Sequence, residues 1–390
     1  MKHNLFRIVS TIVLAVCLLL CVPSSMAKYA TSGNILVPVK KVVLKDFWYT
    51  NSSAIFSVAK DTSSQEGYYA VLIKGGNGGD GVKHSFSTTS GSVAGGNGGL
   101  MLGYIYLTAS DSLVVKIGTA GGNAGTSAYG AAGTNGTDMA KGYRGKCLSS
   151  DDTKFIIDIF NNDYSAGSGA GTILYKNSVS QSNLMMIAGG GGAAASVNTN
   201  VSSKVPGEGG AGGGNYNGPV TSYTDVSSPS TGKVYPGGNG IGSTWSKKST
   251  TYHTNGYGGS VSGGAGGTCG DYTYWLGIAP YTFSQKTAGS GSAYSTSANG
   301  GNGGAGIYLS GPGGGGYAGG GGGAGFGVDR SAAGGGGGSS YINTTAMTEF
   351  SSTAADKYSL LLGKTNGACS GTQANGFAIV YYLGKDKPNG

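Results

Sequence analysis

The sequence predicts an all-β, glycine-rich extracellular protein, and three observations lead to this expectation. Glycine supplies 80 of the 390 residues, roughly three times its ordinary share. Apolar residues form short runs rich in Val, Ile and Tyr that are bounded by Gly, Asn or Ser, as is typical of strands. Gly and Ser interrupt every segment that has helical periodicity. A content of 9 Pro excludes collagen, and 25 Tyr, 10 Phe and 3 Trp argue against disorder.

Residues 1–27 have the order of a secretory signal peptide. Lys2 and Arg7 give a basic start, an apolar stretch covers 8–22, and Ser25-Met26-Ala27 is a small-residue cleavage site. We therefore expect cleavage before Lys28 and an extracellular location, either secreted or associated with the cell surface. An uncleaved membrane anchor is the alternative, because the uncharged stretch is long enough to cross a bilayer. After cleavage we expect no stable membrane span.

The apolar runs are the expected strands, and glycine words stand where many of them end. Several runs alternate between apolar and polar residues, as half-buried strands do. Phe47 to Thr50 is a further candidate strand in an N-terminal β segment. The main expected strands are Ala54–Val58, Tyr68–Ile73, Met101–Leu107, Leu113–Ile117, Phe155–Phe160, Thr172–Tyr175, Leu184–Ile187 and Phe377–Leu383.

A Gly-Gly-Asn word, usually followed by Gly, recurs at 75–79, 95–99, 121–123, 237–240 and 300–303, without the fixed period of a solenoid. Such tracts are either flexible linkers or a packed bundle of extended helices with three residues per turn, in which glycine lets backbones approach closely. We expect the bundle, because the tracts lie between strands and aromatic residues punctuate them. The expected structural glycines are Gly75, Gly76, Gly189, Gly190, Gly313, Gly316, Gly319, Gly322, Gly325, Gly334 and Gly338, and those from 313 to 325 keep a three-residue spacing.

Residues 310–343, SGPGGGGYAGGGGGAGFGVDRSAAGGGGGSSYIN, resemble a known signature. It is that of the glycine-rich extracellular domain shared by the anaplastic lymphoma kinase and leukocyte tyrosine kinase receptors and by many secreted or bacterial proteins. Two upstream segments are similar to the family's strands that run into glycine tracts, namely 69–76 and 184–192. The resemblance covers roughly residues 66–384.

The resemblance implies a TNF-like antiparallel β-sandwich with polyglycine-type helices inserted between its strands in a glycine-rich bundle. The expected organisation is a signal peptide at 1–27, an N-terminal β segment at 28–65, the glycine-rich domain at 66–384 and a C-terminal tail at 385–390. The chain contains no kinase domain, so the resemblance does not imply receptor signalling. None of the family's ligand-binding residues can be placed here by a matching motif.

The residues that usually support catalysis are sparse, so we expect no enzyme, no cofactor and no metal site. After the leader, histidine occurs only at His84 and His253, and glutamate only at Glu66, Glu208 and Glu349. No nucleophile elbow, phosphate-binding loop or calcium loop is present. Cys147, Cys269 and Cys369 lack zinc-ligand spacing and allow either one disulfide and a thiol or no disulfide.

Charge and aromatic residues shape the functional expectation. The formal net charge is +8, but lysines are dispersed and arginine is rare, so we expect no nucleic-acid partner. Tyrosine accompanies Gly, Ser and Asn, a combination found on adaptable binding surfaces. Tyr317 and Tyr341 are therefore candidate contact aromatics, unless their rings pack over the tracts. We expect a non-enzymatic, adhesin-like structural or interaction protein with a protein or glycan ligand at a cell surface. The alternative is a carbohydrate-binding or enzyme-associated extracellular module.

Overall fold

The computed structural model describes residues 29–32, 35–38, 45–47, 54–62, 65–85, 88–124, 132, 165–198, 207–216, 222–241, 255–269, 272–276, 279–283, 286–294, 300–304, 306, 310–326, 331–350 and 375–388. The chain divides into two compact units, Met1–Val43 and Leu44–Gly390. In the first unit, β1 (Tyr29–Ser32) and β2 (Ile35–Pro38) form an antiparallel pair.

A four-stranded antiparallel sheet in the second unit has the order β3-β22-β5-β8. Its strands are β3 (Lys45–Phe47), β22 (Phe377–Gly384), β5 (Gly67–Lys74) and β8 (Leu100–Leu107). Both faces of β5 are buried, because Val71 and Leu72 point to opposite faces and neither is exposed. This explains why β5 and β8 read as nearly continuous apolar runs rather than as alternating ones.

A seven-stranded antiparallel sheet has the order β13-β14-β21-β11-β10-β9-β4. Side chains of the two sheets meet, because the rings of Phe56 on β4 and Tyr69 on β5 have centroids 5.6 Å apart. The strands are β13 (Thr224–Val226), β14 (Gly232–Tyr235), β21 (Ser340–Asn343), β11 (Leu184–Ala188), β10 (Thr172–Lys176), β9 (Ser112–Lys116) and β4 (Ala54–Ser57).

The remaining elements are short. A helical turn α2 (Val58–Asp61) follows β4, and a 3₁₀ turn η1 (Gln181–Asn183) precedes β11. The small strands are β6 (Gly81–Ser85), β7 (Thr88–Val93), β12 (Val197–Asn198), β15 (Thr268–Cys269), β16 (Tyr272–Leu276), β17 (Ala279–Phe283), β18 (Lys286–Thr287), β19 (Gly325–Phe326) and β20 (Ser331–Ala332). These pairs are antiparallel, except that β12 lies parallel to β6.

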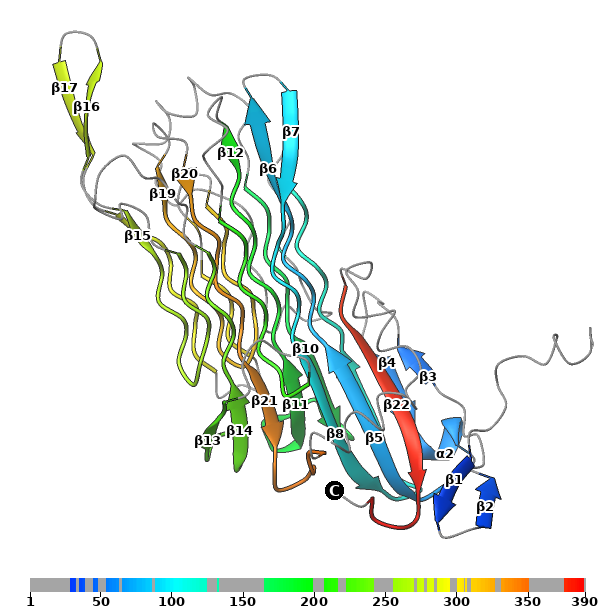
Figure 1. The fold of residues 1–390 in the computed structure, drawn as a ribbon. Helices are drawn as coiled ribbons and strands as arrows, with labels where there is room; N and C mark the ends of the chain where they lie inside the picture. Colours follow the sequence, from blue (N-terminus) through cyan, green and yellow to red (C-terminus); the bar gives the residue numbers. More distant parts are fainter. Residues whose placement is uncertain are drawn as a thin grey trace, which may run out of the picture. The chain divides into compact units, whose positions relative to one another are not determined.

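Glycine-rich segments, several of which continue strands of the two sheets, form the rest of the second unit's core, and we call them glycine tracts. In Figure 1 they run side by side, away from the sheets and toward the short pairs β6–β7 and β19–β20. The tracts are 75–80, 94–99, 118–124, 165–171, 189–196, 207–214, 236–241, 255–259, 263–267, 288–293, 300–304, 310–316, 318–324 and 333–339.

The order of the strands sets the order of the tracts. β11 lies between β10 and β21, and tract 189–196, which continues β11, is hydrogen-bonded both to tract 165–171 and to tract 333–339. Tract 75–80 continues β5 of the other sheet and also bonds to tract 189–196. The sheets therefore hold the tracts in register, and the bundle joins the two sheets.

The expectation of an all-β chain is confirmed in its coarse form, and seven of the expected strands match β4, β5, β8, β9, β10, β11 and β22. β13, β14 and β21 were not expected, because each has at most four residues and two of them adjoin glycine tracts. β3 and β4, which fall within the N-terminal β segment expected at 28–65, belong to the second unit. Some expected features lie outside the described residues: the signal peptide, the expected strand Phe155–Phe160, Cys147, Cys369 and the side chain of Cys269.

Candidate functional site

The expected structural glycines lie where two backbones touch. A Cβ added at nine of them would come within 1.8–2.3 Å of a backbone oxygen in another tract, far below any normal contact. The remaining two, Gly322 and Gly325, also take part in backbone pairing: Gly322 donates to Gly289, and Gly325 pairs with Ala332. The nine are Gly75, Gly76, Gly189, Gly190, Gly313, Gly316, Gly319, Gly334 and Gly338.

Tract 189–196 shows how the backbone groups are satisfied. Gly190, Gly191 and Gly192 donate N–H bonds of 2.6–2.9 Å to three different tracts, and their successors 193–195 donate to the same three. Among the described residues, three other tracts donate to carbonyls of this tract, so it has six hydrogen-bonded neighbours. The acceptor tracts are 310–316, 75–80 and 207–214, and the donor tracts are 94–99, 165–171 and 333–339.

Tract 333–339 is surrounded in the same way. Within the described part of the chain it donates to tracts 189–196, 236–241 and 318–324 and accepts from tracts 207–214, 255–259 and 310–316, the last also through the N–H of the adjoining Tyr317. Every backbone direction is occupied by another backbone, which leaves room only for small side chains such as the buried Ala333 and Ser339 of this tract. The interior of the bundle is therefore built mainly of main chain.

The glycines that are spaced three residues apart from Gly313 to Gly325 do not lie in one continuous tract. The N–H groups of Gly320 and Gly323 donate back to the carbonyls of Gly314 and Gly311, so the chain reverses near Tyr317. A tyrosine fits this reversal because its side chain leaves the bundle there. The side chain of Phe326 lies outside the described residues.

Tyr317 and Tyr341 are buried, with exposed fractions of 3% and 0%. The Tyr317 ring is stacked between Tyr294, with centroids 5.0 Å apart, and Tyr341, at 5.2 Å. The hydroxyl of Tyr317 donates to the Ser228 carbonyl at 2.9 Å. Burial, followed by the proximity of other tyrosines, raises the pKa of Tyr294 and of Tyr317 to about 12. These rings pack where tracts meet the sheet and are not open to a ligand.

A second polar cluster is centred on Glu349. Its Oε1 accepts from the Tyr235 hydroxyl at 2.5 Å and from Asn215 Nδ2 at 2.9 Å, and its Oε2 pairs with Lys233 Nζ at 2.7 Å. Lys233 Nζ also lies 4.1 Å from the ring centroid of Tyr223, which is 47% exposed. This cluster ties the β13–β14 hairpin to the segment after β21 and presents one aromatic ring and one cation at the surface.

The Glu349 carboxylate affects its two proton-bearing neighbours. Burial is the main cause that raises the pKa of Tyr235, and the hydrogen bond to Glu349 adds to it. For Lys233, burial lowers the pKa, but the hydrogen bond and charge of Glu349 outweigh burial and leave it raised. Both groups therefore keep their protons at neutral pH. The arrangement suits a fixed ion pair and offers no group poised for proton transfer.

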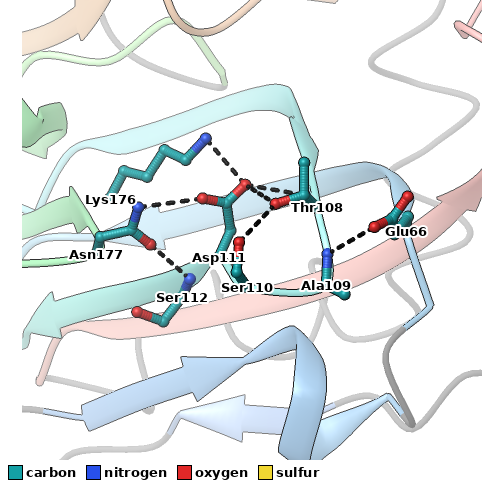
Figure 2. A network of polar contacts seen from close by, with 8 residues as sticks. All are labelled: Glu66, Thr108, Ala109, Ser110, Asp111, Ser112, Lys176 and Asn177. Atoms are coloured by element: carbon teal, nitrogen blue, oxygen red, sulfur yellow. Dashed lines mark hydrogen bonds and ion pairs between the residues drawn. The ribbon is translucent and has the colours of Figure 1, made fainter.

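The network in Figure 2 is centred on Asp111, which is 6% exposed. Its carboxylate accepts from the Thr108 N–H at 2.9 Å and from Asn177 Nδ2 at 3.1 Å, and it pairs with Lys176 at 3.0 Å. Glu66 accepts from the N–H of Ala109 at 3.1 Å in the same loop. These bonds fasten the β8–β9 turn to the end of β10. All of these partners stabilise a turn, and the sequence analysis did not single out Asp111.

Acid should weaken the Asp111 network. Burial raises the pKa of Asp111, but hydrogen bonds from Thr108, Asn177 and Lys176 outweigh it and hold the pKa below its usual value. The stabilising contribution is thus present above the unfolded pKa of about 3.9 and is lost as the pH falls through the folded pKa. We expect Asp111→Asn to cost about 1–3 kcal/mol at pH 7 and to reduce the loss of stability on acidification, measured by thermal melts at pH 6 and pH 3.

The exposed Asp386 provides the control, because Asp386→Asn also removes one carboxylate. The melting temperature of that variant should fall from pH 6 to pH 3 by as much as that of the parent protein. An Asp111→Asn variant with the same pH dependence as Asp386→Asn would contradict the assignment.

Within the described ranges, no group of three or more His, Cys, Asp or Glu side chains is placed to hold a metal ion. In the same part of the chain, no helix has the length and apolar character that a bilayer crossing requires. No protein-family model matches the chain, and comparison with curated proteins gives no match.

Proposed function

We propose that this chain is an exported, non-enzymatic structural and interaction protein, adhesin-like in character, that acts in the extracellular space or at a cell surface. The observation that carries the proposal is the interior of the bundle, which is made of hydrogen-bonded main chain. Such a core is a rigid scaffold, and it leaves only the perimeter to present side chains. The signal-peptide pattern of residues 1–27 supports export. The partner would be a protein or a glycan.

We also propose the finer fold that the family resemblance implies: a TNF-like sandwich with polyglycine-type helices inserted between its strands. The three-residue alternation of partners in tract 189–196 supports such helices, because three residues per turn bring every third N–H to the same side. The Phe56–Tyr69 contact supports a face-to-face packing of the two sheets. Membership of the glycine-rich extracellular domain family is part of this proposal.

A carbohydrate-binding module is the second candidate function. The exposed ring of Tyr223 lies beside the Lys233–Glu349 pair. Aromatic faces stack on sugars, and polar groups next to them bind sugar hydroxyls. The Tyr223 ring and the adjacent ion pair therefore form a candidate glycan contact.

Export and binding can be tested on one preparation. The full-length gene is expressed with its leader in a secreting host, and the exported protein should begin at Lys28. Labelled protein is then applied to an array of extracellular proteins and to a glycan array. Saturable binding to a protein, without chemical turnover of any arrayed ligand, supports the first proposal. Turnover, or retention of the protein with Met1 at its terminus, would overturn it.

Binding confined to glycans would instead support the second candidate. In that case Tyr223→Ala should reduce the glycan-binding signal by more than about tenfold, which is the scale of one lost aromatic contact. Tyr257→Ala is the matched control, because Tyr257 is equally exposed but belongs to a glycine tract. Equal losses in both variants would exclude the Tyr223 surface as the binding site.

A further inference from the structure

The recurring Gly-Gly-Asn word has a specific place in the bundle. In tract 75–80, Gly75 and Gly78 donate to tract 94–99, whereas Gly76 and Gly79 donate to tract 165–171. The third position of each triplet, Asn77 and then Asp80, carries a side chain that is not fully buried. The word therefore places two glycines against neighbours and one polar residue at the perimeter.

These polar side chains reach sideways to the adjacent tract. Asn77 Oδ1 accepts from the N–H of Gly98 at 2.9 Å, and Asp80 Oδ1 accepts from the N–H of Gly95 at 2.9 Å. Gly95 and Gly98 are three residues apart and face the same way. In the interior of the bundle, N–H groups at such positions donate to the backbone of a further tract. Here a side-chain oxygen takes the place of that tract.

The same replacement of a backbone acceptor by a side-chain oxygen recurs around the perimeter. Each case joins a side-chain oxygen of Asn or Ser to a backbone N–H of a tract: Asn123 to Asp80 at 2.9 Å, Asn239 to Gly258 at 2.8 Å, Asn375 to Ala120 at 2.9 Å, Ser290 to Gly266 at 3.4 Å and Ser292 to Asn302 at 2.6 Å. Separate edges of the bundle thus share one arrangement, in which a side-chain oxygen accepts from a backbone N–H group of a tract. Turns that were unrelated to one another would not repeat it.

Asn77 is itself held in place. Lys74 Nζ donates to Asn77 Oδ1 at 2.5 Å, and Asn77 Nδ2 donates to Asn97 Oδ1 at 3.4 Å. The lysine side chain is 4% exposed, so a buried cation fixes the orientation of the amide. With that orientation the oxygen, rather than the amide nitrogen, faces Gly98.

We propose that these perimeter side chains close the edges of the bundle against the addition of another glycine tract, and that the tract they exclude is one from a second copy of this chain. A row of open N–H groups spaced three residues apart is the pattern that each tract offers to its neighbours, so an uncapped edge would accept a tract from another molecule. Sheet proteins protect their edge strands by comparable means.

The test is the double variant Asn77→Ala/Asp80→Ala, which opens both N–H groups of tract 94–99. We expect its weight-average mass, measured by light scattering during size-exclusion chromatography, to rise at least twofold over the parent protein with increasing concentration. Asn77→Asp/Asp80→Asn keeps an acceptor oxygen at both positions and should retain the parent mass.

A double variant that is folded by circular dichroism but keeps the parent mass would overturn the proposal. If that variant does not fold, amide exchange in the parent protein decides. The caps require the Gly95 and Gly98 amides to exchange at least about tenfold more slowly than in an unfolded peptide. Exchange at peptide rates would refute the proposal.

Discussion

Gly191→Val should prevent the second unit from folding stably. A Cβ at this position would lie 1.9 Å from the Gly96 carbonyl oxygen and 2.8 Å from the Gly78 nitrogen. Both are backbone atoms fixed by their own hydrogen bonds, so neither can move aside as a flexible side chain could. We expect a loss of more than about 3 kcal/mol, the upper range for overpacking, a large part of the stability of a typical domain. The measurement is the urea midpoint followed by circular dichroism.

Gly91→Val is the matched control, because a Cβ there would meet nothing within 4 Å. The free energy of unfolding of that variant should lie within about 1 kcal/mol of that of the parent protein. Gly316→Val, where the Cβ would lie 2.3 Å from the Ser339 carbonyl oxygen, should behave like Gly191→Val. If Gly316→Val left the stability unchanged and the amides of 313–325 exchanged at peptide rates, residues 313–325 would be a linker and not part of a bundle.

Tyr341→Ala should produce the largest loss caused by a single side chain. Tyr341 is 0% exposed, stacks on Tyr317 and belongs to a buried cluster that includes residues of β9, β10, β11, β14 and β21. Truncating a buried aromatic residue costs about 3–5 kcal/mol, because burial is lost and a cavity is left. Chemical denaturation at pH 7 measures the change.

Tyr341→Phe separates the ring from its hydroxyl. The hydroxyl donates to the Ser230 carbonyl at 3.1 Å, and its loss should cost only about 1 kcal/mol. If Tyr341→Ala were no more destabilising than Tyr341→Phe, the stacked rings would not be stabilising the junction between bundle and sheet.

Local sequence was sufficient for the coarse fold. The runs that became β5, β8, β9, β10, β11 and β22 are rich in β-branched and aromatic residues, and glycine words border many of them. Their strand character depends on short-range pattern alone. The sequence also predicted that positions 189–192 and 334–338 require glycine, because few structures other than close-packed backbones use such runs. Short segments such as Gly232–Tyr235 had too few residues to be recognised.

The partners of each tract were decided by the tertiary structure alone. Glycine has no side chain, so one tract looks much like another, and hydrogen bonds such as Gly191 to Gly76 join residues far apart in the sequence. Within a sheet, neighbouring strands such as β10, β11 and β21 continue as neighbouring tracts, whereas the bond from Gly191 to Gly76 joins tracts that continue strands of different sheets. The same long-range placement reverses the chain near Tyr317, buries that ring, and puts Asn77 at an edge where its oxygen meets Gly98. Composition determined that backbones would touch, and the tertiary structure decided which ones, because a glycine tract has few side chains that could specify its neighbours.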